Sequence, residues 1–212
     1  MCSSDLSLSQ GTDSVLSKSS VYLLSDHIEY LILGSGAITG AGNSSDNTII
    51  GNSTFNSLFG GAGNDSLFGG GGPDTLNGGT GNDTMVGSSG NDYFVIDSTS
   101  DVYFYSTSNN KNGIISCLEN YTLDANTSFR HLVLDPSGNG IFRGTGNSWD
   151  NTLTGNSLDN TLDGGLGNDT LMGEIGNDYY RINSSDDLVI EKDRKSTRLN
   201  SSHANISYAV FC

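Results

Sequence analysis

The sequence is poor in basic residues and has no long apolar segments. Only 9 of its 212 residues are Lys or Arg, against 24 Asp and Glu, and the formal net charge is −15. This balance excludes a basic nucleic-acid-binding protein, because contacts to phosphates need clustered Lys and Arg. No run of 18 apolar residues occurs, so no segment is predicted to span a membrane. Residues 1–10 also lack the basic start and the apolar stretch of a signal peptide.

Proline is nearly absent, with 2 residues, whereas glycine is abundant, with 29. The glycines have no period of three, which excludes a collagen-like chain. A composition so rich in Gly, Asn, Asp and Ser leaves two interpretations, a disordered chain or a regular fold built from a short repeat. The presence or absence of an internal repeat decides between them.

A nine-residue repeat begins at Gly42 and continues without a gap to Val95, and a second array of four nonads begins at Gly146. Representative nonads are GGAGNDSLF from Gly60 and GGTGNDTMV from Gly78. In every nonad the sixth residue is Asp or Asn, and the eighth is a large apolar or aromatic residue. Such regularity favours a repetitive fold over disorder.

Each nonad predicts one turn and one short strand. The Gly-rich first six positions suit a turn, and the last three suit a strand with one side chain facing inward. Two nonads return the chain to the same side, so that Asp65 stacks with Asp83 and Asp74 with Asp92. Stacked carboxylates repel each other unless a cation lies between them. Carboxylate and carbonyl oxygens in a flexible turn favour Ca²⁺ over softer metals and over Mg²⁺.

The nonads GGAGNDSLF and GGTGNDTMV match the pattern G-G-x-G-x-D-x-U-x, and in this the chain resembles the RTX, or haemolysin-type, calcium-binding repeat proteins. The resemblance implies an all-β fold, a parallel β-roll with Ca²⁺ held between successive turns. It implies ligands of two kinds, Asp side chains and the carbonyls of the Gly-rich turns. The implied side-chain ligands are Asp65, Asp74, Asp83, Asp92, Asp169 and Asp178. The implied carbonyl donors are Gly60, Ala62, Gly63, Gly69, Gly71, Gly72, Gly78, Gly79, Thr80, Gly81, Gly164, Gly165 and Gly167.

Four nonads depart from this pattern and begin GNSSDN, GNSTFN, GNSWDN and GNSLDN. Their sixth residue is Asn, which brings no charge. Their fourth residue is Ser45, Thr54, Trp149 or Leu158 instead of Gly, and a side chain at that position resists a left-handed backbone. We interpret these nonads as turns that continue and cap the coil, with weak or absent calcium sites.

The segments outside the arrays also repeat, which predicts two tandem modules. We expect a β-rich linker unit at 1–41, a first calcium roll at 42–97, a second linker unit at 98–145 and a second roll at 146–192. Both arrays end in GNDY, and the aromatic residues at these ends are expected to cap the coil, with a carbohydrate-binding platform as the alternative. These aromatic residues are Tyr93, Phe94, Tyr179 and Tyr180.

Residues 193–212, DRKSTRLNSSHANISYAVFC, do not continue either pattern. They resemble a translated short-read sequencing adapter, and we expect them to be an artefact that takes no part in fold or function. The native C-terminus is then expected to be missing, and the linker unit that begins at Met1 is expected to be truncated.

No nucleophile elbow, P-loop or dinucleotide fingerprint occurs, so we predict that this chain is not an enzyme. The favoured hypothesis is a calcium-binding module of a secreted bacterial protein that folds on Ca²⁺ binding after export and stabilises its parent. One alternative is the non-catalytic C-terminal part of a secreted protease, lipase or polysaccharide epimerase or lyase. Another is an adhesin or surface-array segment with a glycan or cell-surface ligand. The resemblance implies the type I secretion machinery as a partner and an extracellular location.

Overall fold

The computed structural model describes residues 11–105, 112–125, 127–135 and 142–192, together with the backbone of 198–201 and 210–211. The chain divides into two compact units, Met1–Asn110 and Lys111–Cys212. The described residues form strands and turns only, so this part of the chain contains no helix that could cross a membrane.

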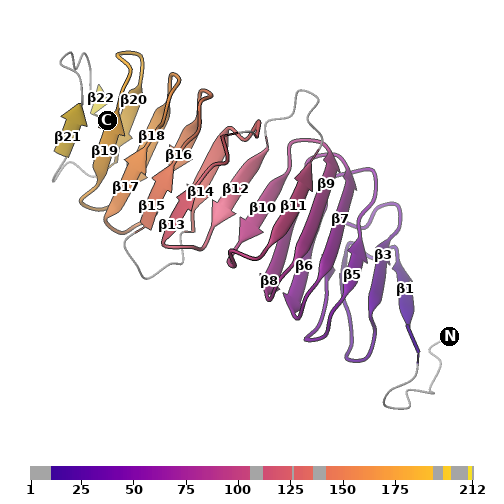
Figure 1. The fold of residues 1–212 in the computed structure, drawn as a ribbon. Coiled ribbons are helices and arrows are strands. Elements are labelled where there is room, and N and C mark those ends of the chain that lie inside the picture. The colour runs from indigo at the N-terminus through magenta and orange to yellow at the C-terminus, as the bar shows by residue number, and fades with distance from the viewer. Residues whose placement is uncertain are drawn as a thin grey trace. The chain divides into compact units, whose positions relative to one another are not determined.

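The first unit is a succession of short strands that alternate between two parallel sheets (Figure 1). One sheet has the order β1-β3-β5-β7-β9-β11, and the other contains β2-β4-β6-β8-β10. The strands are β1 (Ser14–Ser17), β2 (Val21–Leu23), β3 (Tyr30–Leu33), β4 (Thr39–Ala41), β5 (Thr48–Ile50), β6 (Ser57–Ala62), β7 (Ser66–Gly71), β8 (Thr75–Thr80), β9 (Thr84–Ser89), β10 (Tyr93–Ile96) and β11 (Val102–Tyr105).

The second unit repeats this alternation, with the orders β12-β14-β16-β18-β20-β22 and β13-β15-β17-β19-β21. Its strands are β12 (Gly113–Ser116), β13 (Asn120–Thr122), β14 (His131–Leu134), β15 (Phe142–Thr145), β16 (Thr152–Thr154), β17 (Asn160–Asp163), β18 (Thr170–Glu174), β19 (Tyr179–Ile182), β20 (Leu188–Glu191), β21 (Arg198–Ser201) and β22 (Val210–Phe211). The backbones of β21 and β22, within the segment assigned to an adapter, pair with β19 and β20. The adapter origin of this segment stays a prediction.

The register between neighbouring strands is eighteen residues in both arrays, as the nonad spacing predicts. Ser66 pairs with Thr84 and Leu67 with Met85 in the first unit, and Leu153 pairs with Leu171 in the second. All of these pairings are parallel, because each coil of the chain returns to the same side before the next strand begins. The predicted all-β fold, a parallel β-roll, is therefore confirmed.

The core lies between the two sheets and is filled by the eighth residue of each nonad. Strand side chains alternate between faces, so the eighth residue points inward while the ninth points outward. All ten eighth-position side chains are fully buried, as predicted: Ile49, Leu58, Leu67, Leu76, Met85, Phe94, Leu153, Leu162, Leu171 and Tyr180.

Four strands of the first array, β6 to β9, are longer than the three residues predicted per nonad. Each strand from β6 to β9 has six residues, because it continues through the first three positions of the following nonad. Gly61 pairs with Gly79 and Gly70 with Ser88 across neighbouring coils. The glycines predicted as turn residues thus extend the sheets as well, since their backbones approach each other closely. The strands β5 and β16 keep the predicted three residues.

Strands in the predicted linker units lie in the same sheets as the array strands. In the first unit β3 pairs with both β1 and β5, and β11 pairs with β9. In the second unit β14 pairs with both β12 and β16. The coil of each unit therefore extends beyond its nonads, and buried leucines such as Leu31 and Leu132 continue its core.

Because each nonad contributes one side chain to the core, a sharp contrast is expected between two adjacent side chains of β7. Replacing the fully buried Leu67 by Ala leaves a cavity and is expected to lower the free energy of unfolding by about 2–5 kcal/mol. Phe68, which is 37% exposed on the outer face, provides the control, and Phe68→Ala is expected to cost less. Denaturant unfolding of both variants at saturating Ca²⁺ measures the difference. Equal losses for the two variants would contradict this account of the core.

Candidate metal centre

The sixth residues of the nonads form columns inside the roll instead of pointing into solvent. The six predicted Asp ligands are all buried, with exposed fractions between 0% and 2%: Asp65, Asp74, Asp83, Asp92, Asp169 and Asp178. The parallel register places successive members of a column eighteen residues apart, so Asp65 lies next to Asp83 and Asp74 next to Asp92, as predicted.

One oxygen of each Asp carboxylate bonds to the backbone of the preceding coil. Asp83 Oδ1 accepts the N–H of Asp65 at 2.8 Å, and Asp92 Oδ1 accepts the N–H of Asp74 at 2.9 Å. The same bond joins Asp and Asn positions: Asp169 Oδ1 accepts the N–H of Asn151 at 2.8 Å. The columns therefore connect consecutive coils by charge-assisted hydrogen bonds, the stronger kind in proteins.

The second carboxylate oxygen, Oδ2, is buried and has no hydrogen-bond donor among the described residues. This holds for Asp65, Asp74, Asp83, Asp169 and Asp178. A buried charged oxygen without a donor is strongly unfavourable. A bound cation would compensate the charge of these five oxygens. Carboxylate oxygens are ligands that suit Ca²⁺.

The first residue of each nonad must be glycine because the carboxylate lies against it. A Cβ added at Gly60 would be 2.3 Å from Asp65 Oδ2 and 2.4 Å from the carbonyl oxygen of Gly78. A Cβ at Gly69 would be 2.4 Å from Asp74 Oδ2. The glycine thus leaves a space into which a carboxylate oxygen and a carbonyl oxygen both point.

Among the predicted carbonyl ligands, the carbonyl of Gly78 lies beside an Asp side chain. Its oxygen and Asp65 Oδ2 both face Gly60. Three other predicted carbonyl ligands lie beside the sixth-position Asn side chain of a nonad in the same way. They are the carbonyls of Gly60, Gly69 and Gly164. The ligand role of the remaining carbonyls stays a prediction. They lie at strand ends and in turns and belong to Ala62, Gly63, Gly71, Gly72, Gly79, Thr80, Gly81, Gly165 and Gly167.

Burial raises the pKa of these carboxyl groups. The pKa of Asp65 is raised to about 6, and those of Asp74, Asp169 and Asp178 to about 7. Desolvation is the main cause in each case, and the backbone N–H bond to Oδ1 offsets part of it. Neighbouring carboxylates add to the increase, as Asp83 does for Asp65. The surroundings of the columns thus disfavour the negatively charged form of these carboxyl groups.

The turns of the Asp nonads need left-handed backbone at the second and fourth residues. Gly63 and Gly167, at fourth positions, have φ of 116° and 118°. Second positions in the last nonad of each array are not glycine, yet Ser88 and Glu174 adopt φ of 68° and 74°. The left-handed conformation costs a side-chain-bearing residue about 1–2 kcal/mol, so both residues are held there by their surroundings.

The asparagine turns are closed by their own side chains. In GNSSDN, Asn47 Oδ1 accepts the N–H of Asn43 at 2.7 Å, and Asn43 Oδ1 accepts the N–H of Ser45 at 2.8 Å. The Asn47 amide group also donates to the carbonyl of Ile28. The same second-to-sixth bond, at 2.7 Å, occurs in the turn from Asn52 to Asn56 and in the corresponding turns of the second unit. These turns satisfy their buried polar groups without an ion, which supports the interpretation of weak or absent sites.

Two residues that were not predicted as ligands continue the columns past the nonads. Asp101 Oδ1 accepts the N–H of Asp83 at 3.1 Å, and Asp187 Oδ1 accepts the N–H of Asp169 at 2.9 Å. Both lie eighteen residues after the Asp that they contact, so the column spacing was the available signal. The surrounding residues no longer match a nonad, which is why the repeat alone did not reveal them.

The aromatic residues at the array ends divide between core and surface. Phe94 and Tyr180 are fully buried, which excludes their side chains from a surface carbohydrate platform. The Tyr180 hydroxyl donates to Glu191 Oε2 at 2.7 Å, so its polar end is satisfied inside the roll. Tyr93 and Tyr179 are half-buried.

The raised pKa values predict that protons can replace the cation. A carboxyl group with a raised folded pKa stabilises the fold when protonated, and this stability is lost as the pH rises through about 6 to about 7. In chelator, strand content measured by circular dichroism is therefore expected to increase as the pH falls from about 7 towards about 4. Light scattering controls for aggregation, and a decrease in strand content over this range would contradict the assignment.

A comparison with protein families supports the geometric assignment of the columns. The family described as the RTX calcium-binding nonapeptide repeat, in four copies, matches residues 41–76, 68–102 and 145–180. These segments contain all six predicted Asp ligands and also Asp97 and Asp101. No curated protein and no solved structure was found to match the chain. The matched repeats and the parallel roll agree, and residues 41–102 and 145–180 are RTX, or haemolysin-type, calcium-binding repeats.

Proposed function

We propose that this chain is a non-catalytic module that folds when it binds Ca²⁺ outside the cell and thereby stabilises the protein to which it belongs. The observation that carries the proposal is the set of buried Oδ2 atoms, in both units, that have no donor among the described residues. Five carboxylates share this arrangement, and each belongs to a nonad of the G-G-x-G-x-D type or its close variants.

The ligands proposed for the ion are the Asp side chains and the turn carbonyls that face them. Bound Ca²⁺ supplies the positive charge that the buried carboxylates lack. Asp65 Oδ2 and the Gly78 carbonyl illustrate the donor set, since both oxygens are hard and both face the space beside Gly60. The hydrogen bonds from the backbone to Oδ1 hold each carboxylate in place, so that Oδ2 stays directed to this space.

The energetics favour a fold that depends on the ion. Each coil buries one large side chain per nonad, while the carboxylates in its interior repel one another and lack solvent. Ca²⁺ binding to the folded chain contributes its free energy directly to folding. Extracellular calcium modules bind with a Kd of about 10⁻⁴ to 10⁻³ M. At such affinities the arrays remain unfolded in the cytosol and fold where Ca²⁺ is abundant.

A secreted parent protein follows from this dependence, because only the outside of the cell provides Ca²⁺ in the range required. The match to the RTX repeat supports an extracellular location for this chain, since the resemblance to RTX proteins implies export. In this proposal the chain contributes stability and calcium-dependent folding to its parent. It takes no part in catalysis.

Calcium dependence of folding is the direct test. The full chain in chelator at neutral pH is expected to give the circular dichroism spectrum of a largely unfolded polypeptide, and millimolar CaCl₂ is expected to restore the strand spectrum. Mg²⁺ at equal concentration controls for ionic strength and for divalent charge. Full strand content in chelator at neutral pH would refute calcium-dependent folding.

Removing one charge from a column tests the ligand assignment. Asp74→Asn keeps the shape of the side chain but removes the charge of an oxygen that has no donor, so Ca²⁺ affinity is expected to fall by roughly tenfold or more. Asp26→Asn removes the same charge from an exposed residue of the same unit and is expected to have little effect. Calorimetric titration with CaCl₂ measures both variants. Equal affinities would contradict the role of Asp74.

A further inference from the structure

The first Asp column ends in carboxylates that lie outside the nonads. Asp101, directly before β11, takes the place that the next sixth-position residue would occupy. Its Oδ1 accepts the N–H of Asp83, and its Oδ2 accepts the N–H groups of Asp97 at 3.3 Å and Ser98 at 3.1 Å. Asp101 is thus fixed by backbone donors from two neighbouring segments of the roll.

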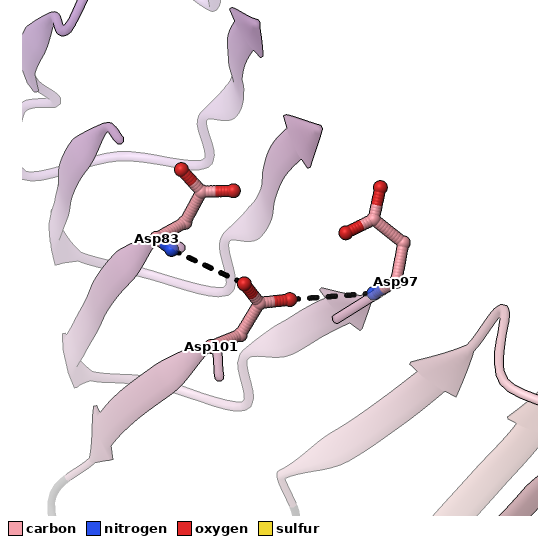
Figure 2. A group of neighbouring side chains, drawn as sticks. All are labelled: Asp83, Asp97 and Asp101. Atoms are coloured by element: carbon pink, nitrogen blue, oxygen red, sulfur yellow. Dashed lines mark hydrogen bonds between the residues drawn. The ribbon is translucent and has the colours of Figure 1, made fainter. Parts of the chain in front are cut away.

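Three carboxylates meet at this end of the column. Asp83, Asp97 and Asp101 each place one oxygen so that all three atoms lie within 4.8 Å of one another. Figure 2 shows the side chains of Asp83 and Asp97 turned towards a common space, with Asp101 beside it. Asp83 precedes β9, Asp97 follows β10 and Asp101 precedes β11, so the cluster joins three strands. Burial and the Asp101 charge both raise the pKa of Asp97.

The buried oxygen of Asp83 distinguishes this cluster from an ordinary acidic surface. Asp83 is 1% exposed, and its Oδ2 has no hydrogen-bond donor among the described residues. Both oxygens of Asp101, in contrast, are bonded to backbone N–H groups. The cluster therefore combines a buried charged oxygen that needs a positive partner with two further carboxylates placed by the backbone.

We propose that Asp83, Asp97 and Asp101 form an additional Ca²⁺ site that closes the first array. The proposal rests on the calcium-binding function proposed above. It extends that function, because Asp97 and Asp101 lie past the last nonad that ends at Val95 and are not among the Asp ligands predicted from the sequence. An ion bound here would connect the start of β9, the end of β10 and the start of β11, so that the last coils of the array fold together.

The second array offers a natural comparison. Asp187 repeats the role of Asp101, since its Oδ1 accepts the N–H of Asp169 and its Oδ2 accepts the N–H groups of Asn183 and Ser184, both at 3.0 Å. Asn183 stands where the first array has Asp97. The second array end therefore has two carboxylates and one amide, and it is expected to bind Ca²⁺ more weakly than the first.

This difference defines a reciprocal pair of variants, Asp97→Asn and Asn183→Asp. Calorimetric titration of the full chain with CaCl₂ counts the bound ions and gives their affinities. Asp97→Asn is expected to lose one ion per chain or to bind it at least about tenfold more weakly, and Asn183→Asp is expected to gain one ion or to bind it at least about tenfold more tightly. Asp186→Asn removes one charge from an exposed residue near the second site and is expected to leave the titration unchanged.

Circular dichroism at saturating CaCl₂ verifies that each variant is folded. If wild type binds Ca²⁺ but the titrations of Asp97→Asn and Asn183→Asp both match that of wild type, the additional site is refuted while the proposed function stands. If wild type itself binds no Ca²⁺, the proposed function fails, and the additional site fails with it. If Asp97→Asn does not fold, the gain of an ion or of affinity by Asn183→Asp decides the question, and no gain of either kind overturns the site.

Discussion

A buried carboxylate whose two oxygens have different partners is the interaction on which both rolls depend. Oδ1 takes a backbone N–H from the coil before it, as Asp83 does from Asp65, and so sets the distance and register between coils. Oδ2 has no donor among the described residues, and a cation, or a proton at low pH, compensates its charge. The same side chain therefore fixes the spacing of the coils through Oδ1 and offers a ligand for a metal ion through Oδ2. A roll with correct strand pairing still carries uncompensated negative charge at neutral pH until a cation binds.

The exchange of Asp for Asn at the sixth position changes the chemistry of a coil without changing its backbone register. Asn47 turns its oxygen to the N–H of Asn43 and uses its amide group to donate to the preceding coil, which leaves no oxygen that needs a cation. Asp65 Oδ1 accepts the N–H of Asn47, so an aspartate coil contacts the asparagine coil before it. Coils of two kinds, one closed by amides and one dependent on charge compensation, can therefore follow one another within a continuous core.

Much of the fold and of the site could be predicted from the sequence, because both follow from a short period. The nine-residue spacing gave the buried eighth residues, the eighteen-residue register and the Asp columns. The long strands β6 to β9 were not predicted, since pairing of glycine backbones leaves no apolar signal. Asp101 and Asp187 were missed because each is a single residue in a segment without the repeat. The part played by Asn43 depends on hydrogen bonds that only the folded turn reveals.

The order of the two kinds of coil gives each array a direction. Both arrays begin with two asparagine nonads, and the aspartate nonads follow them. Asp65 is the first Asp of its column, and its Oδ1 accepts the backbone N–H of Asn47. The turn that contains Asn47 is already closed by its own side-chain hydrogen bonds. If Ca²⁺ drives folding as proposed, the two asparagine nonads, which need no ion, start the roll, and the coils that bind Ca²⁺ add to them one after another. Each array is then a short polymer whose nucleus lies at its N-terminal end and whose elongation is driven by metal.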